Sequence, residues 1–326
     1  MTIESVKFPF KKALVTGGAG FIGSHIIEEL LQLGVEVISI DDYSGGKEEN
    51  LADFPNRHLL TAANCDVTDY DHLKEYFNGV EVVFHNAASK KTICLRDPRR
   101  DLDVNGKGTF NILELSRDYG VQKVVHASTG SVYGEAKYFP QDEKHPLTPT
   151  SYYGVSKLAG EKYAKAFEHL YGLNTTVLRY FHVYGSRQES ADNRGGVVAI
   201  YCRRVLDGLP LTIFGDGSQQ RSFTYVKDVV RANLLVASHP ETKGEVYNCA
   251  SGLKITISEL ANKVKHIAGR EDLDINYDDW TPGDIKVFDI DHSKIETLGF
   301  NGWTGFDQGL KETIQWYQQE NGSSKK

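Results

Sequence analysis

A glycine-rich segment near the N-terminus constrains the fold more than any other feature of the sequence. It reads VTGGAGFIG over residues 15–23 and places Gly17, Gly20 and Gly23 at G-x-x-G-x-x-G spacing. An apolar run precedes it, and isoleucines and leucines at helical spacing follow it. Glycines between a strand and a helix permit a tight turn and let the backbone approach a pyrophosphate, which the free N–H groups of the helix can bind. The segment therefore predicts a dinucleotide-binding βα unit rather than a tight turn alone.

The rest of the N-terminal half alternates short β-branched runs with helical patterns. Alternation of this kind, with almost continuously apolar strands, is typical of a parallel sheet covered by helices on both faces. We therefore expect an α/β fold with a Rossmann, doubly wound parallel sheet. The expected strands are 13–15, 35–40, 80–84, 124–127, 175–178 and 245–248, and the expected helices lie near 110–115, 151–170 and 226–237.

The pattern changes after about residue 183, where Gly, Asp, Gln and Arg become more frequent and the elements become shorter. We interpret this region as a smaller, interleaved C-terminal domain that binds a substrate. The expected boundaries are 1–182 for the dinucleotide-binding domain, with 222–250 returning to it, and 183–221 with 251–326 for the substrate-binding domain.

Composition limits the partners that the chain can have. It has 326 residues and a net charge of −7, which argues against binding nucleic acid. No apolar run reaches the length of a membrane span, and the first ten residues lack the apolar core of a signal peptide. The four cysteines form no C-x-x-C pair, so neither a metal site nor a disulfide framework is expected. These features favour a cytoplasmic protein.

Carboxylates follow the second and third expected strands. Asp41 and Asp42 end the run 35–40, and Asp66 precedes Val67 after the next run. A carboxylate at the end of the second strand accepts hydrogen bonds from the adenosine ribose and repels a 2′-phosphate. The sequence therefore predicts NAD rather than NADP, with Asp41 as the better ribose ligand and Asp66 near the adenine amino group.

A Tyr-x-x-x-Lys pair opens the expected helix 151–170. Tyr153 and Lys157 are four residues apart and so share one helix face. A nearby ammonium and a positive nicotinamide ring would lower the pKa of a tyrosine from its usual value of about 10. The phenolate can then take a proton from a sugar hydroxyl while hydride leaves the same carbon. Thr129, at the end of the strand 124–127, can hydrogen bond to the reacting oxygen.

Together, these features resemble the extended short-chain dehydrogenase/reductases, and most closely the NAD-dependent epimerase/dehydratase group that acts on nucleotide sugars. The similarity runs from about residue 12 to residue 316. Further matching segments are HNAA (85–88), NGKGT (105–109), LRYF (178–181), VYG (183–185), LTIFGDG (211–217), RSFTYV (221–226) and PGD (282–284).

The resemblance implies tightly held NAD, a nucleotide-sugar substrate of the UDP type, and a catalytic trio of Thr129, Tyr153 and Lys157. It also implies a homodimer formed through two helices near 104–119 and 151–170. The implied cofactor-binding residues are Gly17, Gly20, Phe21, Ile22, Gly23, Asp41, Asp42, Asp66, Val67, Ala87, Ala88, Lys90, Asn105, Tyr153 and Lys157. The implied substrate-binding residues are Lys91, Ser131, His182, Val197, Phe214, Gly215, Arg221 and Asp284.

Two residues after Thr129 decide between the reactions of the family. Sugar 4,6-dehydratases carry Asp-Glu at these positions and decarboxylating relatives also use a glutamate there, whereas this chain has Gly130 and Ser131. Elimination and decarboxylation need that carboxylate, but 4-epimerisation needs only oxidation at C4, rotation of the keto sugar and return of the hydride. We therefore expect a nucleotide-sugar 4-epimerase.

Other readings stay open. The same trio serves a nucleotide-sugar 4-dehydrogenase, a 2-epimerase or a reductase. A non-enzymatic NAD-binding regulator is a further alternative, although such relatives typically lose the tyrosine. Two departures point to an unusual substrate, because His182 stands where the family usually has Asn, and Thr281 stands where it usually has Arg.

Overall fold

The central element of the protein is a sheet of seven parallel strands. The computed structural model describes residues 8–89, 94–190, 195–280 and 286–323. The strand order is β3-β2-β1-β4-β5-β6-β11, so the chain winds outward in both directions from β1 and β4. This confirms the expected Rossmann, doubly wound fold. The strands are β1 (Lys12–Thr16), β2 (Glu36–Asp41), β3 (Leu60–Asn64), β4 (Val82–His85), β5 (Lys123–Thr129), β6 (Thr175–Tyr180) and β11 (Val246–Cys249).

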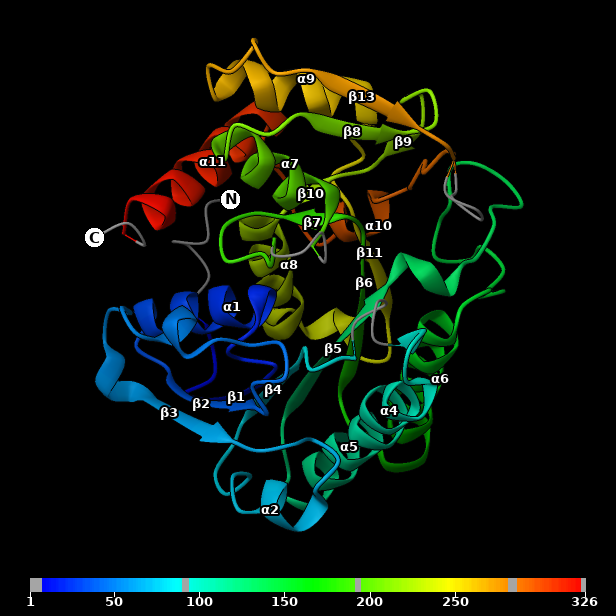
Figure 1. Cartoon of the computed structure of the whole chain (residues 1–326). Coiled ribbons are helices and arrows are strands. Elements are labelled where there is room, and N and C mark those ends of the chain that lie inside the picture. Colours follow the sequence, from blue (N-terminus) through cyan, green and yellow to red (C-terminus); the bar gives the residue numbers. More distant parts are fainter. Residues whose placement is uncertain (1–7, 90–93, 191–194, 281–285, 324–326) are drawn as a thin grey trace.

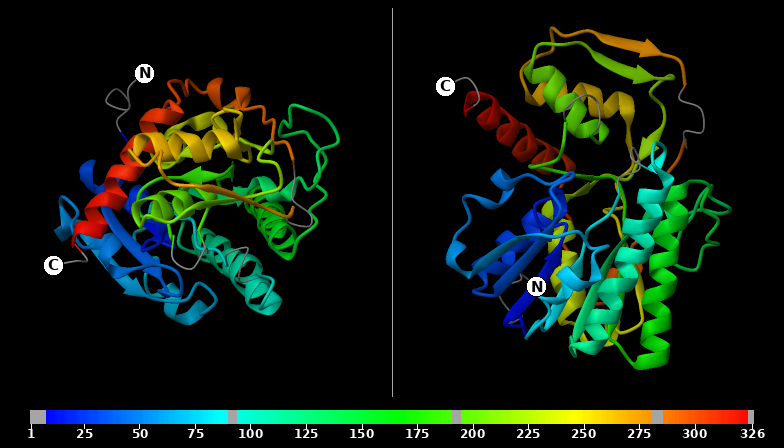
Figure 2. Two further views of the ribbon diagram at one scale, coloured as in Figure 1. Left: turned by 45° about the horizontal axis from the view of Figure 1, so that its top comes forward. Right: turned by 60° about the horizontal axis from the view of Figure 1, so that its bottom comes forward.

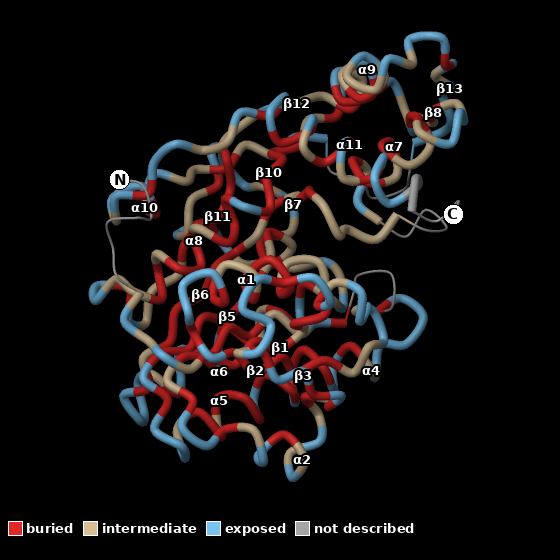
Figure 3. Tube along the Cα trace, turned by 90° about the vertical axis from the view of Figure 1, so that its left-hand side faces the viewer, coloured by how far each residue is buried: buried red, intermediate tan, exposed pale blue. Residues whose placement is uncertain are grey.

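Helices cover both faces of this sheet (Figure 1). On one face, α1 (Phe21–Gln32) and α8 (Val226–Ser238) bury a core with one set of strand side chains. On the other face, α2 (Tyr70–Lys74), α5 (Thr109–Asp118) and α6 (Tyr152–Tyr171) bury the alternate set. Figure 3 shows the strands buried along most of their length, as the apolar sequence runs predict.

A smaller lobe lies beyond the carboxyl ends of the strands (Figure 2). Its strands β8 (Leu211–Phe214) and β13 (Ile275–Asp278) pair in parallel, and its helices α7, α9 and α11 share a separate apolar core with them. These helices are α7 (Val197–Leu206), α9 (Ile257–Ile267) and α11 (Phe306–Ser323). The small elements near the lobe are β7 (Val183–Tyr184), β9 (Gln220–Arg221), β10 (Thr224–Tyr225), β12 (Ile255–Thr256) and α10 (Ser293–Glu296). Between β6 and β11 the chain visits this lobe and then rejoins the main sheet through α8 and β11.

A helical segment begins well before the expected helix at 110–115. It comprises α4 (Pro98–Leu102), a π-helical turn η4 (Asp103–Gly108) and then α5. The Asp97 side chain caps α4 by accepting a hydrogen bond from the Arg100 N–H at 3.0 Å, and Pro98 occupies the first turn. This segment brings α4 against the first turns of α6, beside the site described below.

None of the helices in the described ranges is long and apolar enough to cross a membrane.

Candidate active site

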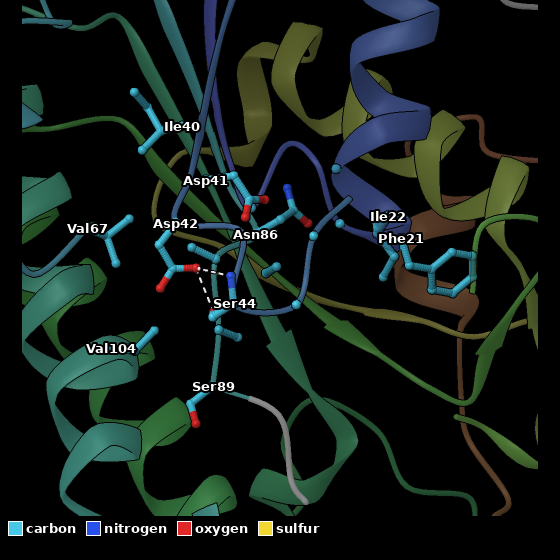
Figure 4. Close-up of a pocket in the computed structure, with 18 of the residues that line it drawn as sticks. Phe21, Ile22, Ile40, Asp41, Asp42, Ser44, Val67, Asn86, Ser89 and Val104 are labelled. Atoms are coloured by element: carbon cyan, nitrogen blue, oxygen red, sulfur yellow. Dashed lines mark hydrogen bonds between the residues drawn. The ribbon is translucent and has the colours of Figure 1, made fainter. Parts of the chain in front are cut away.

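A cavity of about 460 Å³ opens at the carboxyl ends of the strands, where a doubly wound sheet binds its ligands. The glycine segment, the ends of β2 and β3 and the loop after β4 line it, together with Tyr153 and Lys157 from α6. In Figure 4, Phe21 and Ile22 lie on one side of the cavity, and Val67 and Val104 lie on the other. The predicted cofactor residues that line it are Gly17, Gly20, Phe21, Ile22, Gly23, Asp41, Asp42, Asp66, Val67, Ala87, Ala88, Tyr153 and Lys157.

The glycines are required by the backbone geometry of the loop between β1 and α1. Gly17 has a φ of +64°, which side chains rarely adopt. A Cβ on Gly23 would lie 2.1 Å from the Gly17 carbonyl oxygen, so only glycine lets α1 pack against the loop. This is the close packing that the sequence motif predicts.

Asp41 fixes this loop to the end of β2. Its carboxylate is 7 % exposed and accepts hydrogen bonds from the N–H groups of Ala19 and Tyr43, both at 2.9 Å. It lines the cavity as predicted, but part of its hydrogen-bonding capacity already serves the protein backbone. Its position beside Asp42 is visible in Figure 4.

Arg100 of α4 joins the other two predicted carboxylates. One of its terminal nitrogens lies 2.8 Å from Asp42 and 2.8 Å from Asp66. Arg100 hydrogen bonds to Asp66 and lies close to it, and these contacts, with the Thr68 hydrogen bonds, lower the pKa of that carboxyl against the opposing effect of burial. All three side chains line the cavity, so Arg100 spans the ends of β2 and β3 at the predicted adenosine side.

Three polar atoms of the cavity lining are buried and have no hydrogen-bond partner in the described part of the chain. They are the amide nitrogen of Asn86, the hydroxyl of Ser89 and one terminal nitrogen of Arg187. Buried donors are normally satisfied, so these groups fit a ligand that brings many acceptor oxygens. A dinucleotide with its pyrophosphate and ribose hydroxyls has this chemistry, and the glycine loop supplies the matching cradle.

The catalytic trio predicted from the sequence comes together at the inner end of the cavity. Tyr153 lies in the first turn of α6, Lys157 lies one turn later, and Thr129 ends β5 and hydrogen bonds to Tyr153. The Ser151 side chain caps the helix by accepting a hydrogen bond from the Gly154 N–H at 3.1 Å. Capping fixes the turn that carries Tyr153.

Burial dominates the acid–base properties of this pair. It raises the pKa of Tyr153 to about 12, with Asp101 and Cys94 raising it further and the Thr129 hydrogen bond opposing them. It also lowers the pKa of Lys157 to about 8, against the opposing effect of Glu161 and Asp101. The prediction of a lowered tyrosine pKa is therefore wrong for the protein alone, because loss of hydration outweighs any attraction from the ammonium.

Asn105 lies behind the cavity and connects its walls. Its side-chain oxygen accepts a hydrogen bond from the Ser89 N–H at 2.9 Å, and its side-chain nitrogen donates to Ser156 and Asp101 at 3.0 and 2.9 Å. The predicted cofactor role thus becomes an indirect one, since Asn105 contacts residues of the cavity rather than lining it.

Gly130 has no space for a side chain. A Cβ at this position would lie 2.3 Å from the ring of Phe181. The next residue, Ser131, donates its backbone N–H to the Thr129 hydroxyl at 3.2 Å. Neither position carries a carboxylate, and a side chain at position 130 would require the Phe181 ring to move.

The predicted substrate residues that the structure describes lie outside this cavity, mostly among elements that lead to the small lobe. The rings of His182 and Phe288 have centroids 4.6 Å apart, and the Arg221 guanidinium lies 5.3 Å from the centroid of Phe288. His182 has a φ of +38°, a left-handed conformation in which Asn and His are among the better tolerated side chains. This explains why the family's Asn can be replaced by His here.

The remaining substrate predictions are spread over the small lobe. Val197 begins α7, Phe214 is exposed at the end of β8, and a Cβ on Gly215 would meet the ring of Trp280 at 2.4 Å. Lys90, Lys91, Thr281 and Asp284 lie outside the described residues.

Sequence analysis missed several residues of the site. Arg100 and Asp101 belong to a polar stretch without apolar periodicity, although the Asp-Pro pair before them is a helix-start signal. Arg187 lies in a loop without any such signal, whereas Asn86 belongs to the HNAA segment (85–88), which could have indicated it.

Known proteins resemble this chain over nearly its whole length. The model of the NAD dependent epimerase/dehydratase family matches residues 13–250. A putative UDP-glucose 4-epimerase of Methanocaldococcus jannaschii is 39% identical over 94% of this chain and 99% of its own length.

Two solved structures extend the comparison. The UDP-glucose 4-epimerase of Thermotoga maritima with UDP-glucose has a TM-score of 0.89 and 38% identity over 95% of this chain and 99% of that one. The UDP-glucose 4-epimerase of Thermus thermophilus in complex with NAD has a TM-score of 0.86 and 36% identity over 94% of this chain and 99% of that one.

Proposed function

Because the chain belongs to the NAD dependent epimerase/dehydratase family and its cofactor is NAD, we propose that it is a UDP-sugar 4-epimerase. It inverts the hydroxyl at C4 by removing a hydride from that carbon and returning it to the opposite face of the sugar. The relatives that act on UDP-glucose match this chain from end to end, which supports both the reaction and the UDP group.

Two observations carry the proposal: the predicted catalytic trio lies together, and Gly130 has no space for a side chain. Thr129, Tyr153 and Lys157 provide what oxidation of a hydroxyl needs. The ring of Phe181 fills the place where a dehydratase carries the first residue of its carboxylate pair. The site can therefore exchange hydride and a proton at C4 but lacks the acid that dehydration requires.

Each residue of the trio has a distinct role. Bound NAD supplies the nicotinamide that accepts the hydride and gives it back. Tyr153 takes the proton of the 4-hydroxyl, and Thr129 hydrogen bonds to the same oxygen. Lys157 contributes a positive charge that stabilises the phenolate.

Within this proposal the predicted substrate and cofactor residues keep their roles, except that Asn105 acts indirectly. Arg221 is placed to grip the diphosphate of the nucleotide sugar, since a guanidinium matches phosphate oxygens in a bidentate way. Its burial beside Phe288, which also packs against His182, supports a built site rather than a surface charge.

The test is a set of UDP-sugars incubated with the holoenzyme in deuterated water and followed by NMR. We expect inversion at C4 with no deuterium at C3 or C5. Deuterium at C5 with loss of the 6-hydroxyl would show dehydration, and a released 4-keto sugar would show a dehydrogenase; either result contradicts the proposal.

We further propose a homodimer formed through α5 and α6. Large apolar side chains are exposed along these helices and the end of α4, where a monomer would leave them in water. They are Leu102, Phe110, Tyr152, Val155, Tyr163, Leu170 and Tyr171.

The domain boundaries given above and a cytoplasmic location also remain proposals. The return of α8 and β11 to the main sheet supports assigning 222–250 to the dinucleotide-binding domain. All four cysteines are buried and none of them forms a disulfide, which supports a reducing compartment.

A further inference from the structure

A buried carboxylate lies beside the catalytic pair and has no place in the mechanism above. Asp101, on α4, is 1 % exposed. A carboxylate is rarely buried without a partner, because its hydration is lost. In the described part of the chain Asp101 forms no ion pair within 4.0 Å, so its charge is compensated in another way.

Hydrogen bonds tie Asp101 to the first turn of α6. Asp101 accepts a hydrogen bond from the Asn105 side-chain nitrogen at 2.9 Å, and it also hydrogen bonds to Ser156. The single Ser156 hydroxyl proton can go either to Asp101 or to the Tyr153 carbonyl oxygen, which lies 3.1 Å away. Asp101 is therefore connected to the helical turn that carries Tyr153 and directly precedes Lys157.

Its charge acts on the same two residues. Asp101 raises the pKa of both Lys157 and Tyr153, and Lys157 in turn opposes the rise in the pKa of Asp101 that burial causes. These reciprocal effects place the carboxylate within electrostatic range of the pair.

Among the described residues, Glu161 is the larger negative charge acting on Lys157, and the other charged groups around the pair are neutral or matched. Glu161 of α6 is held by Arg179 of β6 at 2.7 Å, and Arg100 faces Asp42 and Asp66. Burial and the Lys157 charge lower the pKa of His85 in β4 to about 3, and burial keeps His126 in β5 neutral as well. Cys94 also acts on Tyr153. The remaining charged groups on these helices face outward: Arg99 on α4, Asp103 and Lys107 on η4, and Glu114, Arg117 and Asp118 on α5.

We propose that Asp101 is a positioning residue for the reaction: its buried carboxylate adds to the charge of Glu161 in keeping Lys157 cationic beside Tyr153, and it holds Asn105 and Ser156 against the catalytic turn. The inference rests on the proposed roles of Tyr153 and Lys157. It adds an anionic group on α4 to a site otherwise built from β5 and α6.

Removing this charge has a signature that a purely structural residue lacks. Removing a neighbouring negative charge lowers the pKa of every ionisable group in the site, because each deprotonated form is then less strongly opposed. Both limbs of the pH profile therefore move to lower pH in Asp101→Asn, by on the order of one unit. Loss of packing alone would lower the rate at every pH and leave the limbs in place.

The first experiment compares kcat against pH for the wild type, Asp101→Asn and the control Asp103→Asn. Asparagine keeps the shape of Asp101 and can still accept from Asn105. Asp103 is exposed two residues away, so its charge is screened by water, and its variant keeps the wild-type profile. Limbs that stay in place in Asp101→Asn overturn the proposal.

The second readout does not depend on turnover. Absorbance of the tyrosine phenolate is titrated in the wild type and in Tyr153→Phe, and the difference isolates Tyr153. The same pair of titrations in the Asp101→Asn background gives a lower Tyr153 midpoint if the charge acts as proposed, and an unchanged midpoint if it does not. A thermal melt of each variant checks that it is folded under the conditions of the titration. If no UDP-sugar is epimerised but the midpoint still shifts, the proposed function fails while the role of Asp101 stands.

Discussion

At the scale of single residues, the site depends on what burial does to Tyr153 and Lys157. Burial raises the pKa of the tyrosine to about 12 and lowers that of the lysine to about 8, so it shifts both groups toward their neutral forms. Catalysis requires the charged state of the pair. For Lys157, the negative charges of Glu161 and Asp101 oppose burial. For Tyr153, the Thr129 hydrogen bond opposes burial, whereas Asp101 adds to its effect.

Tyr153→Phe removes the hydroxyl that exchanges the proton. We expect turnover to fall by at least about a hundredfold, as is usual for loss of a general base. NAD stays bound because the rest of the cavity is unchanged. Initial rates with UDP-glucose and the NAD content of the purified protein measure both effects. Tyr152→Phe is the matched control, since Tyr152 is exposed next to it; wild-type rates in Tyr153→Phe would refute the mechanism.

Arg100→Ala leaves Asp42 and Asp66 facing each other without their shared cation. We expect NAD to be retained about tenfold more weakly, because two partly exposed ion pairs at the adenosine side are lost together. Equilibrium dialysis of the variant against NAD gives the affinity. The neighbouring Arg99 is exposed and points away from the cavity lining, so Arg99→Ala should bind as the wild type does. Equal affinities in both variants would remove Arg100 from the binding site.

At the scale of elements, the junction of β1 and α1 shows how far a local motif predicts structure. The three glycines identify the turn, its ligand class and the helix that follows, because each requirement is imposed by backbone atoms only a few residues away. The same holds for the strands, whose apolar runs predict β1, β2, β4, β5 and β6.

Elements that are defined by distant contacts were not predictable in this way. The start of α4 is polar, and its importance comes from contacts of Arg100 and Asp101 with other parts of the chain. The burial of the catalytic pair could not be predicted from the sequence either. The predicted direction of the Tyr153 pKa shift is therefore wrong for the protein without its cofactor. Phe181 and Gly130 are 51 residues apart, and only the folded chain shows that one ring excludes a side chain at the other.

Gly23→Ala tests the packing of α1 on the glycine loop. The added Cβ would meet backbone atoms of Gly17 and Gly18, which cannot rotate away as a side chain would. We expect a loss of about 1–3 kcal/mol in unfolding free energy together with weaker NAD binding. Thermal melts followed by circular dichroism measure the first effect. Gly305→Ala, where the Cβ meets open space, should change neither quantity.

At the scale of the whole molecule, three buried histidines connect stability to pH. Burial lowers the pKa of His25 and of His85 to about 3 and lowers that of His126 well below its usual value. The unfolded chain binds protons at these sites below about pH 6.5, whereas the folded protein does not. Their contribution to stability is therefore present above pH 6.5 and is lost as the pH falls toward 3.

Urea unfolding at pH 7.5 and pH 5 measures this loss. Each histidine should cost about 2 kcal/mol between those two values. His58 is exposed, so His58→Ala serves as the control and should lose the same unfolding free energy between the two pH values as the wild type. An unfolding free energy that does not fall between pH 7.5 and pH 5 would contradict the prediction.

The proposed dimer is a second property of the whole molecule. Tyr163→Glu places a charge in the middle of the exposed apolar face of α5 and α6, where Tyr163 is 41 % exposed and contacts Phe110. We expect the variant to elute as a monomer in size-exclusion chromatography with light scattering, while the wild type elutes as a dimer. Tyr277→Glu on β13 is the control at an exposed tyrosine elsewhere; a monomeric wild type would refute the proposal.

The position of β11 at the edge of the main sheet also determines the order in which the protein can be made. β11 pairs with β6, but the chain between them, residues 181–245, must leave the ribosome first. Until then the outer edge of β6 presents unpaired N–H and C=O groups, the kind of edge to which other chains attach. The nascent chain thus passes through a stage in which six strands are synthesised and the seventh is missing, and protection of that edge by a chaperone matters most during this interval.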